Sequence, residues 1–102
     1  MICVLATIEA VEGRREQLLT VLRDLVPTVR AEQGCIDYAP MIDTPSGLPP
    51  QGPLRPNVIV MVEKWEGVAA LKAHLKTPHM LQFAKQTANL RVGMSLQVLE
   101  PA

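Results

Sequence analysis

Four side chains in this sequence could carry chemistry, and they stand out in a largely aliphatic chain. Trp65 and Tyr38 are two of only three aromatic residues, and His74 and His79 are the only histidines. An indole, a phenol and two imidazoles, beside an aliphatic segment that contains Met61, would suit an apolar planar ligand with ionisable hydroxyl groups. Histidine titrates near neutral pH and is able to take a proton from such a hydroxyl. The plainer alternatives are that Trp65 packs in the core, His74 faces solvent and His79 packs at a helix start.

His79 is the better candidate for a base. Thr77 and Pro78 predict the start of a helix, with Thr77 as the N-cap and Pro78 in the first helical position. His79 then lies in the first turn, where the positive end of the helix dipole favours the neutral imidazole that accepts a proton. We therefore expect His79 to be the catalytic base. The other expected site residues are ligand contacts: Trp65 and Met61 as pocket walls, Tyr38 and His74 as polar contacts.

The spacing of possible metal ligands argues against a metal centre. His74, His79 and Glu66 are close in the sequence, but no two of them have the i, i+4 spacing of a ligand pair on one helix. The predicted helix start at residue 77 also separates the two histidines. We therefore expect no metal ion, and because the chain lacks a glycine-rich phosphate loop we expect no flavin or other cofactor.

Length, charge and cysteine content limit the class of protein. A chain of 102 residues is enough for one domain, which we expect to span residues 1–102. Ten basic and ten acidic residues cancel, so no basic surface is expected for nucleic acid. Apolar runs such as Val58–Val62 are far shorter than the ~20 residues of a membrane span. The N-terminus has no basic region before its apolar stretch, unlike a signal peptide, so we expect a cytoplasmic protein.

The two cysteines are expected to be structural. Cys3 and Cys35 fall at strand positions where small apolar residues belong, and a buried cysteine there is unreactive. Two cysteines are too few for a disulfide scaffold. Because they fall on strands that are not neighbours in the fold expected below, we predict no bridge between them.

Hydrophobic periodicity predicts the elements that position these residues. Apolar residues at three- and four-residue steps predict helices, and continuous or alternating apolar stretches predict strands. Gly34 ends the first helix, and Pro27 within it predicts a kink or a split of its last turns. In chain order we expect a strand at 2–9, a helix at 14–33, a strand at 35–42, a proline-rich loop at 43–57, a strand at 57–65, a short helix over 68–75, a helix from 77 to about 89 and a strand at 92–99.

This β-α-β-β-α-β order, with its second helix broken in two, is the ferredoxin-like α+β pattern. Its antiparallel sheet carries helices on one face only. The third strand is apolar on both sides, with Val58, Val60 and Val62 on one side and Ile59, Met61 and Trp65 on the other. The side without helices needs another cover, and a second copy of the same sheet is the simplest one. We therefore expect an obligate homodimer.

The segment Val58–Glu66, VIVMVEKWE, and its continuation Ala73–Met80, AHLKTPHM, resemble the signature of the antibiotic biosynthesis monooxygenase superfamily. Arg30–Ile42 and Leu96–Pro101 also fit, so the resemblance covers nearly the whole chain. Within the superfamily the chain is most similar to the small bacterial quinol monooxygenases. The resemblance implies a dimeric α+β barrel with one pocket per subunit between sheet and helices. It also implies oxidation of quinols or polyphenols by O₂ without flavin, haem or metal.

Other branches of the superfamily fit less well. Haem-degrading relatives carry a histidine where this chain has Ala84 and an asparagine near Thr7, and polyketide-tailoring relatives use an asparagine and an arginine near Met61 and Lys85. We therefore expect a cofactor-independent monooxygenase of menadiol-like quinols, whose partners are a small aromatic substrate and O₂. The alternative is a non-catalytic dimeric binding protein for hydrophobic small molecules on the same scaffold.

Overall fold

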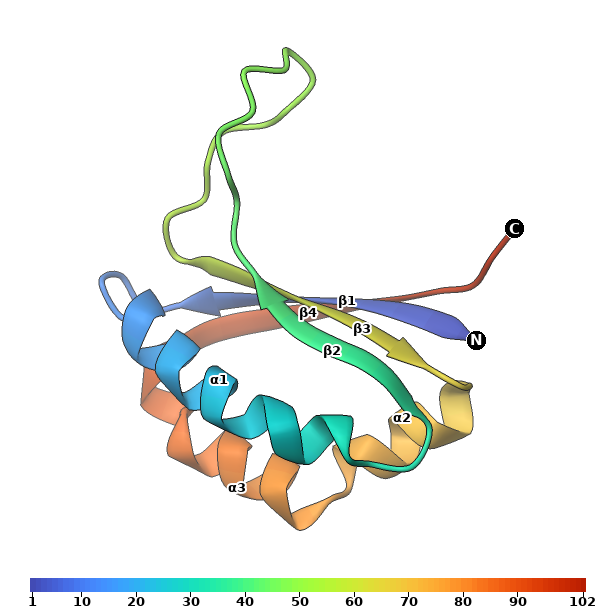
Figure 1. Ribbon diagram of the computed structural model, residues 1–102. Helices are drawn as coiled ribbons and strands as arrows, with labels where there is room; N and C mark the ends of the chain where they lie inside the picture. Colours follow the sequence, from blue (N-terminus) through green and yellow to red (C-terminus); the bar gives the residue numbers. More distant parts are fainter.

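The computed structural model describes all 102 residues, as a four-stranded antiparallel sheet with helices on one face (Figure 1). In chain order the elements are β1 (Ile2–Ala10), α1 (Arg15–Arg30), β2 (Cys35–Met41), β3 (Val58–Trp65), α2 (Val68–Leu75), α3 (Pro78–Gln86), the 3-10 turn η1 (Ala88–Leu90) and β4 (Arg91–Leu99). The strands lie in the order β2-β3-β1-β4. This confirms the ferredoxin-like α+β fold that the sequence predicts. Every helix is too short or too polar to span a lipid bilayer.

The core lies between the sheet and the helices. Every second residue of β1 and β3 faces the helices and is buried, which is the period-2 pattern of a sheet covered on one side. α1 contributes Leu18, Leu22 and Val29 to this core, and these residues repeat on one side of the helix. The buried sheet residues on this side are Ile2, Val4, Ala6, Ile8 and Ala10 of β1 and Ile59, Met61, Glu63 and Trp65 of β3. Most are aliphatic, so the carboxyl of Glu63 is an unusual member of this layer.

α1 continues through Pro27 to Arg30 as one helix, so the predicted split of its last turns does not occur. Proline removes only its own N–H from the helical hydrogen bonds, and the fully buried Val29 anchors the turn that follows. Nε of Arg30 then donates a hydrogen bond to the carbonyl oxygen of Tyr38, 3.1 Å away. The end of α1 is therefore held beside β2.

Thr77 and Pro78 separate α2 from α3, as predicted. The Thr77 hydroxyl donates to the carbonyl of His74 at 2.8 Å and accepts from the backbone N–H of Met80 at 3.4 Å. Pro78 occupies the first position of α3, where its missing N–H costs no helical hydrogen bond. This break places His74 in the last turn of α2 and His79 in the first turn of α3.

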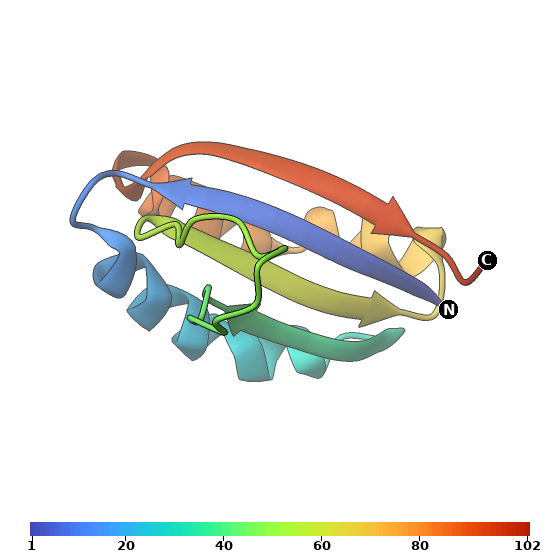
Figure 2. The ribbon, with the colours of Figure 1, turned by 90° about the horizontal axis from the view of Figure 1, so that it is seen from above.

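The other face of the sheet has no helix over it (Figure 2). Its side chains include the apolar residues Leu5 of β1, Val58, Val60 and Val62 of β3 and Leu99 of β4. The proline-rich loop, residues 42–57, rises from this side, away from the helices (Figure 1). Arg55 pairs with the Asp43 carboxylate through both Nε and Nη2, each at 2.8 Å, and closes the base of the loop. The loop therefore does not cover the space between the sheet and the helices of its own chain.

The turn between α1 and β2 depends on Gly34. Gly34 has a φ of +85°, and a Cβ there would lie 2.6 Å from the Cβ of Ala70 in α2. Gly13 has a similar φ of +78°, with nothing within 4 Å of an added Cβ. We predict that Gly34→Ala lowers the free energy of unfolding by clearly more than Gly13→Ala, which should cost about 1 kcal/mol from backbone strain alone. Urea unfolding measures both losses, and equal losses would contradict the close packing of α2 on this turn.

Candidate functional site

An apolar cavity lies between the sheet and the helices α2 and α3. Its volume is about 50 Å³, and eleven of its thirteen lining residues are hydrophobic. Three of these are methionines, including Met61, and their unbranched side chains adapt readily to a ligand. A neighbouring hollow of about 180 Å³ between α3 and β4 shares four of the lining residues, so the two apolar spaces adjoin. The polar groups at the cavity belong to Tyr38, Glu63 and His74.

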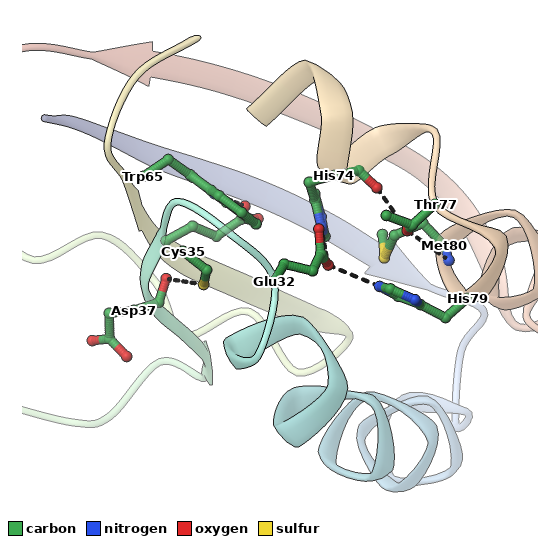
Figure 3. A network of polar contacts seen from close by, with 9 residues as sticks. Glu32, Cys35, Asp37, Trp65, His74, Thr77, His79 and Met80 are labelled. Carbon is green, nitrogen blue, oxygen red and sulfur yellow. Dashed lines mark hydrogen bonds and ion pairs between the residues drawn. The ribbon is translucent and has the colours of Figure 1, made fainter. Parts of the chain in front are cut away.

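A single carboxylate holds both histidines (Figure 3). Oε2 of Glu32 lies 2.8 Å from Nδ1 of His74 and 2.8 Å from Nε2 of His79. Because an ionised carboxylate only accepts hydrogen bonds, each of these two ring nitrogens carries a proton and donates it. The His74 side chain is 2% exposed and that of His79 is 27% exposed. The turn after α1, the end of α2 and the start of α3 therefore meet at one oxygen atom.

The other ring nitrogen of His74 has no partner in the chain. With the proton held on Nδ1, the neutral ring has a free lone pair on Nε2. Nε2 is not fully enclosed, and His74 is one of the residues that line the cavity. The ring packs against Trp65 and Tyr38, with centroids 4.6 Å and 5.6 Å away. The alternative that His74 faces solvent is therefore wrong.

Trp65 holds a second carboxyl of the site. Its Nε1–H donates to Oε1 of Glu63 at 2.9 Å, and both side chains lie on the helix-facing side of β3. Trp65 is fully buried behind His74 and does not itself line the cavity. Burial raises the pKa of the Glu63 carboxyl to about 7, against the lowering effect of the Trp65 hydrogen bond and with a smaller increase from the charge of Glu32. Near neutral pH, Glu63 is therefore present both as acid and as carboxylate.

Tyr38 is a hydrogen-bond donor at the cavity. It lies opposite Glu63 in the pairing of β2 with β3 and is 2% exposed. Its hydroxyl has no partner in the chain and is not fully enclosed. Burial, and then the charges of Glu63 and Glu32, raise the pKa of Tyr38 well above its ordinary value. The phenol therefore keeps its proton at neutral pH and offers it to a ligand.

His79 lies outside the lining of this cavity. It borders a groove between α1 and α3, whose walls include Asp24, Thr28 and Gln82. It is connected to the cavity through Glu32 and His74, that is, by two hydrogen bonds in series. Its predicted role as the base stays a prediction. The structure brings the other expected residues together around the cavity or directly behind it.

Glu32, His74 and His79 are also the residues that could hold a metal ion. Their ligand atoms all lie within 4.8 Å of one another, and two imidazoles with one carboxylate form a donor set that suits Zn²⁺ or Fe²⁺. Here the same atoms pair with one another through hydrogen bonds. Glu66, grouped with the histidines from the sequence, is exposed and is not part of this cluster. Glu32 was missed because it lies 42 and 47 residues before the two histidines and no local motif marks it.

The two cysteines lie apart from this chemistry. Cys3 on β1 and Cys35 on β2 are free and half-buried, and β3 separates their strands, as predicted. Burial, and then the charges of Glu32, Glu63 and Asp37, raise the pKa of the Cys35 thiol. A thiol with a raised pKa is a poor nucleophile at neutral pH.

Comparison with known sequences identifies a family that shares this fold. The family model described as antibiotic biosynthesis monooxygenase matches residues 1–86, which include Glu32, Glu63 and both histidines. The chain is also 39% identical, over 103 aligned residues, to the Escherichia coli (strain K12) protein named "Probable quinol monooxygenase YgiN". That alignment covers 99% of this chain and 98% of the relative.

Solved structures share this fold. The structure of PA3566 from Pseudomonas aeruginosa matches with a TM-score of 0.81 at 31% identity, covering 99% of this chain and 93% of that one. Rv0793 from Mycobacterium tuberculosis matches with a TM-score of 0.79 at 24% identity, over 99% of this chain and 94% of that one, and shows the shared fold alone. The family match over most of the chain and the full-length relative lead to one conclusion: this chain belongs to the antibiotic biosynthesis monooxygenase family.

Proposed function

We propose that this protein is a cofactor-independent monooxygenase that oxidises quinols or related polyphenolic aromatics with O₂. The relative's name supports the substrate class. The observation that carries the proposal is the contact of Nδ1 of His74 with Glu32, which leaves Nε2 without a partner at an apolar cavity that Tyr38, with its unpartnered hydroxyl, also lines. Deprotonation of a phenolic hydroxyl requires a base to take the proton and a hydrogen-bond donor to stabilise the anion, and this apolar cavity offers both.

The proposed chemistry starts with the loss of a hydroxyl proton. Nε2 of His74 takes the proton, and the hydroxyl of Tyr38 donates a hydrogen bond to the phenolate that forms. Among mostly apolar side chains such a hydrogen bond is stronger than in water. A quinol phenolate is electron-rich enough to reduce O₂ directly. The chain then needs only to bind the substrate away from water, take its proton and stabilise the anion.

Glu32 and His79 act through His74 in this proposal. The Glu32 carboxylate keeps the proton on Nδ1 and stabilises the imidazolium that forms when Nε2 takes a second proton. His79 donates to the same oxygen and so helps to fix the position of Glu32. The base is therefore assigned to His74, and His79 becomes a positioning residue. This assignment differs from the sequence-based expectation, in which His79 is itself the base.

The cavity lining supports an aromatic substrate rather than a phosphorylated one. No lysine or arginine lines the cavity, so a phosphate there would lose its hydration without gaining a cationic partner. Arg91, at the neighbouring hollow, already donates to Thr87 and to the carbonyl of Ala84. A flat apolar ring with hydroxyl groups matches the methionine-rich lining and its few polar groups.

We predict that the protein forms quinone from menadiol in air faster than autoxidation does. His74→Gln should lower kcat about 100-fold or more, because a positioned base contributes 10²- to 10⁴-fold. His79→Ala should lower kcat about tenfold with KM little changed, because it acts only through Glu32. Lys72→Gln, at an exposed position of α2, is the control and should match the wild type. Full turnover by His74→Gln would contradict the assignment, and menadione binding without any turnover would favour the non-catalytic binding protein.

We also propose a homodimer formed through the helix-free face of the sheet. That face carries apolar residues on β1 and β3, and Leu5 there is 38% exposed. The net charge of zero gives no long-range repulsion between two copies. In this arrangement the loop 42–57, which rises from the same face, flanks the partner subunit.

Light scattering tests the dimer directly. We predict a mass about twice the 11.2 kDa of the chain at micromolar concentration. Val60→Glu places a charge on the helix-free face and should shift the protein toward monomers, because an unpaired charge in an interface core is costly. Val68→Glu, on an exposed position at the start of α2, should leave the mass unchanged. A folded wild-type protein of monomer mass would contradict the proposed dimer.

A further inference from the structure

Glu63 is a buried carboxyl that the proposed deprotonation by His74 does not use. It is 4% exposed and lines the apolar cavity. None of the ion pairs in the structure includes it. Its one side-chain hydrogen bond is the 2.9 Å contact from Nε1 of Trp65. Burial of a carboxyl without a cationic partner lowers the stability of the fold. A leucine or methionine at this position would fill the same space without that loss.

One carboxyl oxygen of Glu63 has no hydrogen-bond partner in the chain. Oε1 accepts from Trp65, whereas Oε2 has no partner in the chain. Oε2 is not fully enclosed, and Glu63 is one of the residues that line the cavity. The indole therefore fixes one half of the carboxyl and leaves the other half available to a ligand.

The groups that face Glu63 offer no positive countercharge other than a protonated histidine. Across β1 its partner is Val4, and across β2 its partner is Tyr38. From α2 the neighbour at the cavity is His74, and the charge of Glu32 opposes the ionisation of Glu63. Because no cation in the chain holds Glu63 in its ionised form, a ligand that donates a hydrogen bond to it favours the carboxylate, and a ligand that accepts one favours the protonated acid.

We propose that Glu63 is a second catalytic residue, which binds the second hydroxyl of a dihydroxy-aromatic substrate and takes up its proton as the substrate is oxidised. This inference rests on the proposed function and narrows its substrate class to aromatic diols. The diol hydroxyl donates to the Glu63 carboxylate. The quinone carbonyl that replaces the hydroxyl has no proton and accepts a hydrogen bond from the protonated Glu63 instead.

The two proton acceptors balance the reaction. As a monooxygenase reaction, one quinol and one O₂ give one hydroxylated quinone and one water. One oxygen atom is inserted into a ring C–H bond and the other leaves as water, so four electrons pass from the substrate to O₂ and both O–H bonds of the diol break. One proton goes to Nε2 of His74 and the other to Oε2 of Glu63. Both protons then pass to the reduced oxygen, which restores neutral His74 and ionised Glu63. A substrate with a single hydroxyl would leave Glu63 without a donor.

Quinone binding tests this role without turnover. The protonated fraction of a carboxyl with a pKa of about 7 falls about tenfold between pH 6 and pH 8. If protonated Glu63 donates to the quinone, the Kd for menadione in the wild type should rise with pH over this range. Glu63→Gln keeps an acceptor for Trp65 and donates at every pH. We expect the ratio of Kd at pH 8 to Kd at pH 6 to be about tenfold larger in the wild type than in Glu63→Gln. Glu66→Gln, an exposed carboxyl just beyond β3, should keep the wild-type ratio.

Urea unfolding at pH 5 and pH 8 checks that the variant folds. The folded-state pKa of Glu63, about 7, lies above its ordinary value of 4.5, so the wild type should lose stability as pH rises between these two values. Glu63→Gln should lack this part of the loss. Trp65→Phe is the second variant, because removal of the indole N–H should raise the pKa of Glu63 further and move the pH dependence of menadione binding to higher pH.

Turnover separates this proposal from the proposed function. If the wild type oxidises menadiol and Glu63→Gln lowers kcat at least tenfold, both stand. If the wild type shows no turnover but the menadione Kd ratios differ as expected, the proposed function and the catalytic role of Glu63 both fail, and only the hydrogen bond from protonated Glu63 to a bound quinone stands. Equal Kd ratios in the wild type and Glu63→Gln, or no saturable menadione binding to the wild type, would overturn the role of Glu63.

Discussion

Two hydrogen bonds into one oxygen atom, Oε2 of Glu32, hold together the three chain segments that build this site. Each measures 2.8 Å, and the donors are Nδ1 of His74 and Nε2 of His79. An imidazole has two nitrogens and, when neutral, one proton, so the carboxylate decides which nitrogen of His74 is left as a base. His74 itself lines the cavity. Without Glu32 the same fold would hold a buried histidine of undetermined tautomer.

The fold gives the two carboxyl groups different surroundings, and this gives them different tasks. Glu32 lies at a turn and accepts from two imidazoles, so it serves as a fixed charge. Glu63 lines the cavity, and its only side-chain hydrogen-bond donor is the indole of Trp65. Burial raises the pKa of Glu63 to about 7. Two carboxyl groups in environments that differ in this way can take different acid–base roles. The alternation of β3 is what puts Glu63 and Trp65 on one side, since residues two apart share a face.

The sequence predicts most of the architecture because the elements rest on local patterns. The continuous apolar stretches of β1 and β3 and the Thr77-Pro78 helix start are local signals, and both lie where they were expected. Of the two outcomes predicted for Pro27, the split of α1 is wrong, because the helix continues to Arg30, and the kink stays a prediction. The site was only half predictable. Trp65, Tyr38, Met61 and the histidines are conspicuous by type, whereas the burial of His74 depends on how α2 packs on the sheet.

The two carboxylates differ in how far the sequence marks them. Glu32 gains its role from contacts 42 and 47 residues away, and nothing in the turn around it differs from an ordinary helix end. Glu63 has a positional signal, because it stands on the inward-facing side of a strand whose other inward positions are apolar. A charged residue at an inward strand position is therefore a feature that a sequence can offer as a sign of function.

The proposed deprotonation requires that Glu32 hold the proton of His74 on Nδ1 and leave Nε2 as the base. Nitrogen-15 NMR of the histidine side chains in the wild-type protein, at a pH where both imidazoles are neutral, reports the tautomer of each ring. We predict a protonated Nδ1 and an unprotonated Nε2 for His74, and the opposite tautomer, with the proton on Nε2, for His79. A proton on Nε2 of His74 would contradict it, because that ring would have no lone pair to offer to a substrate hydroxyl.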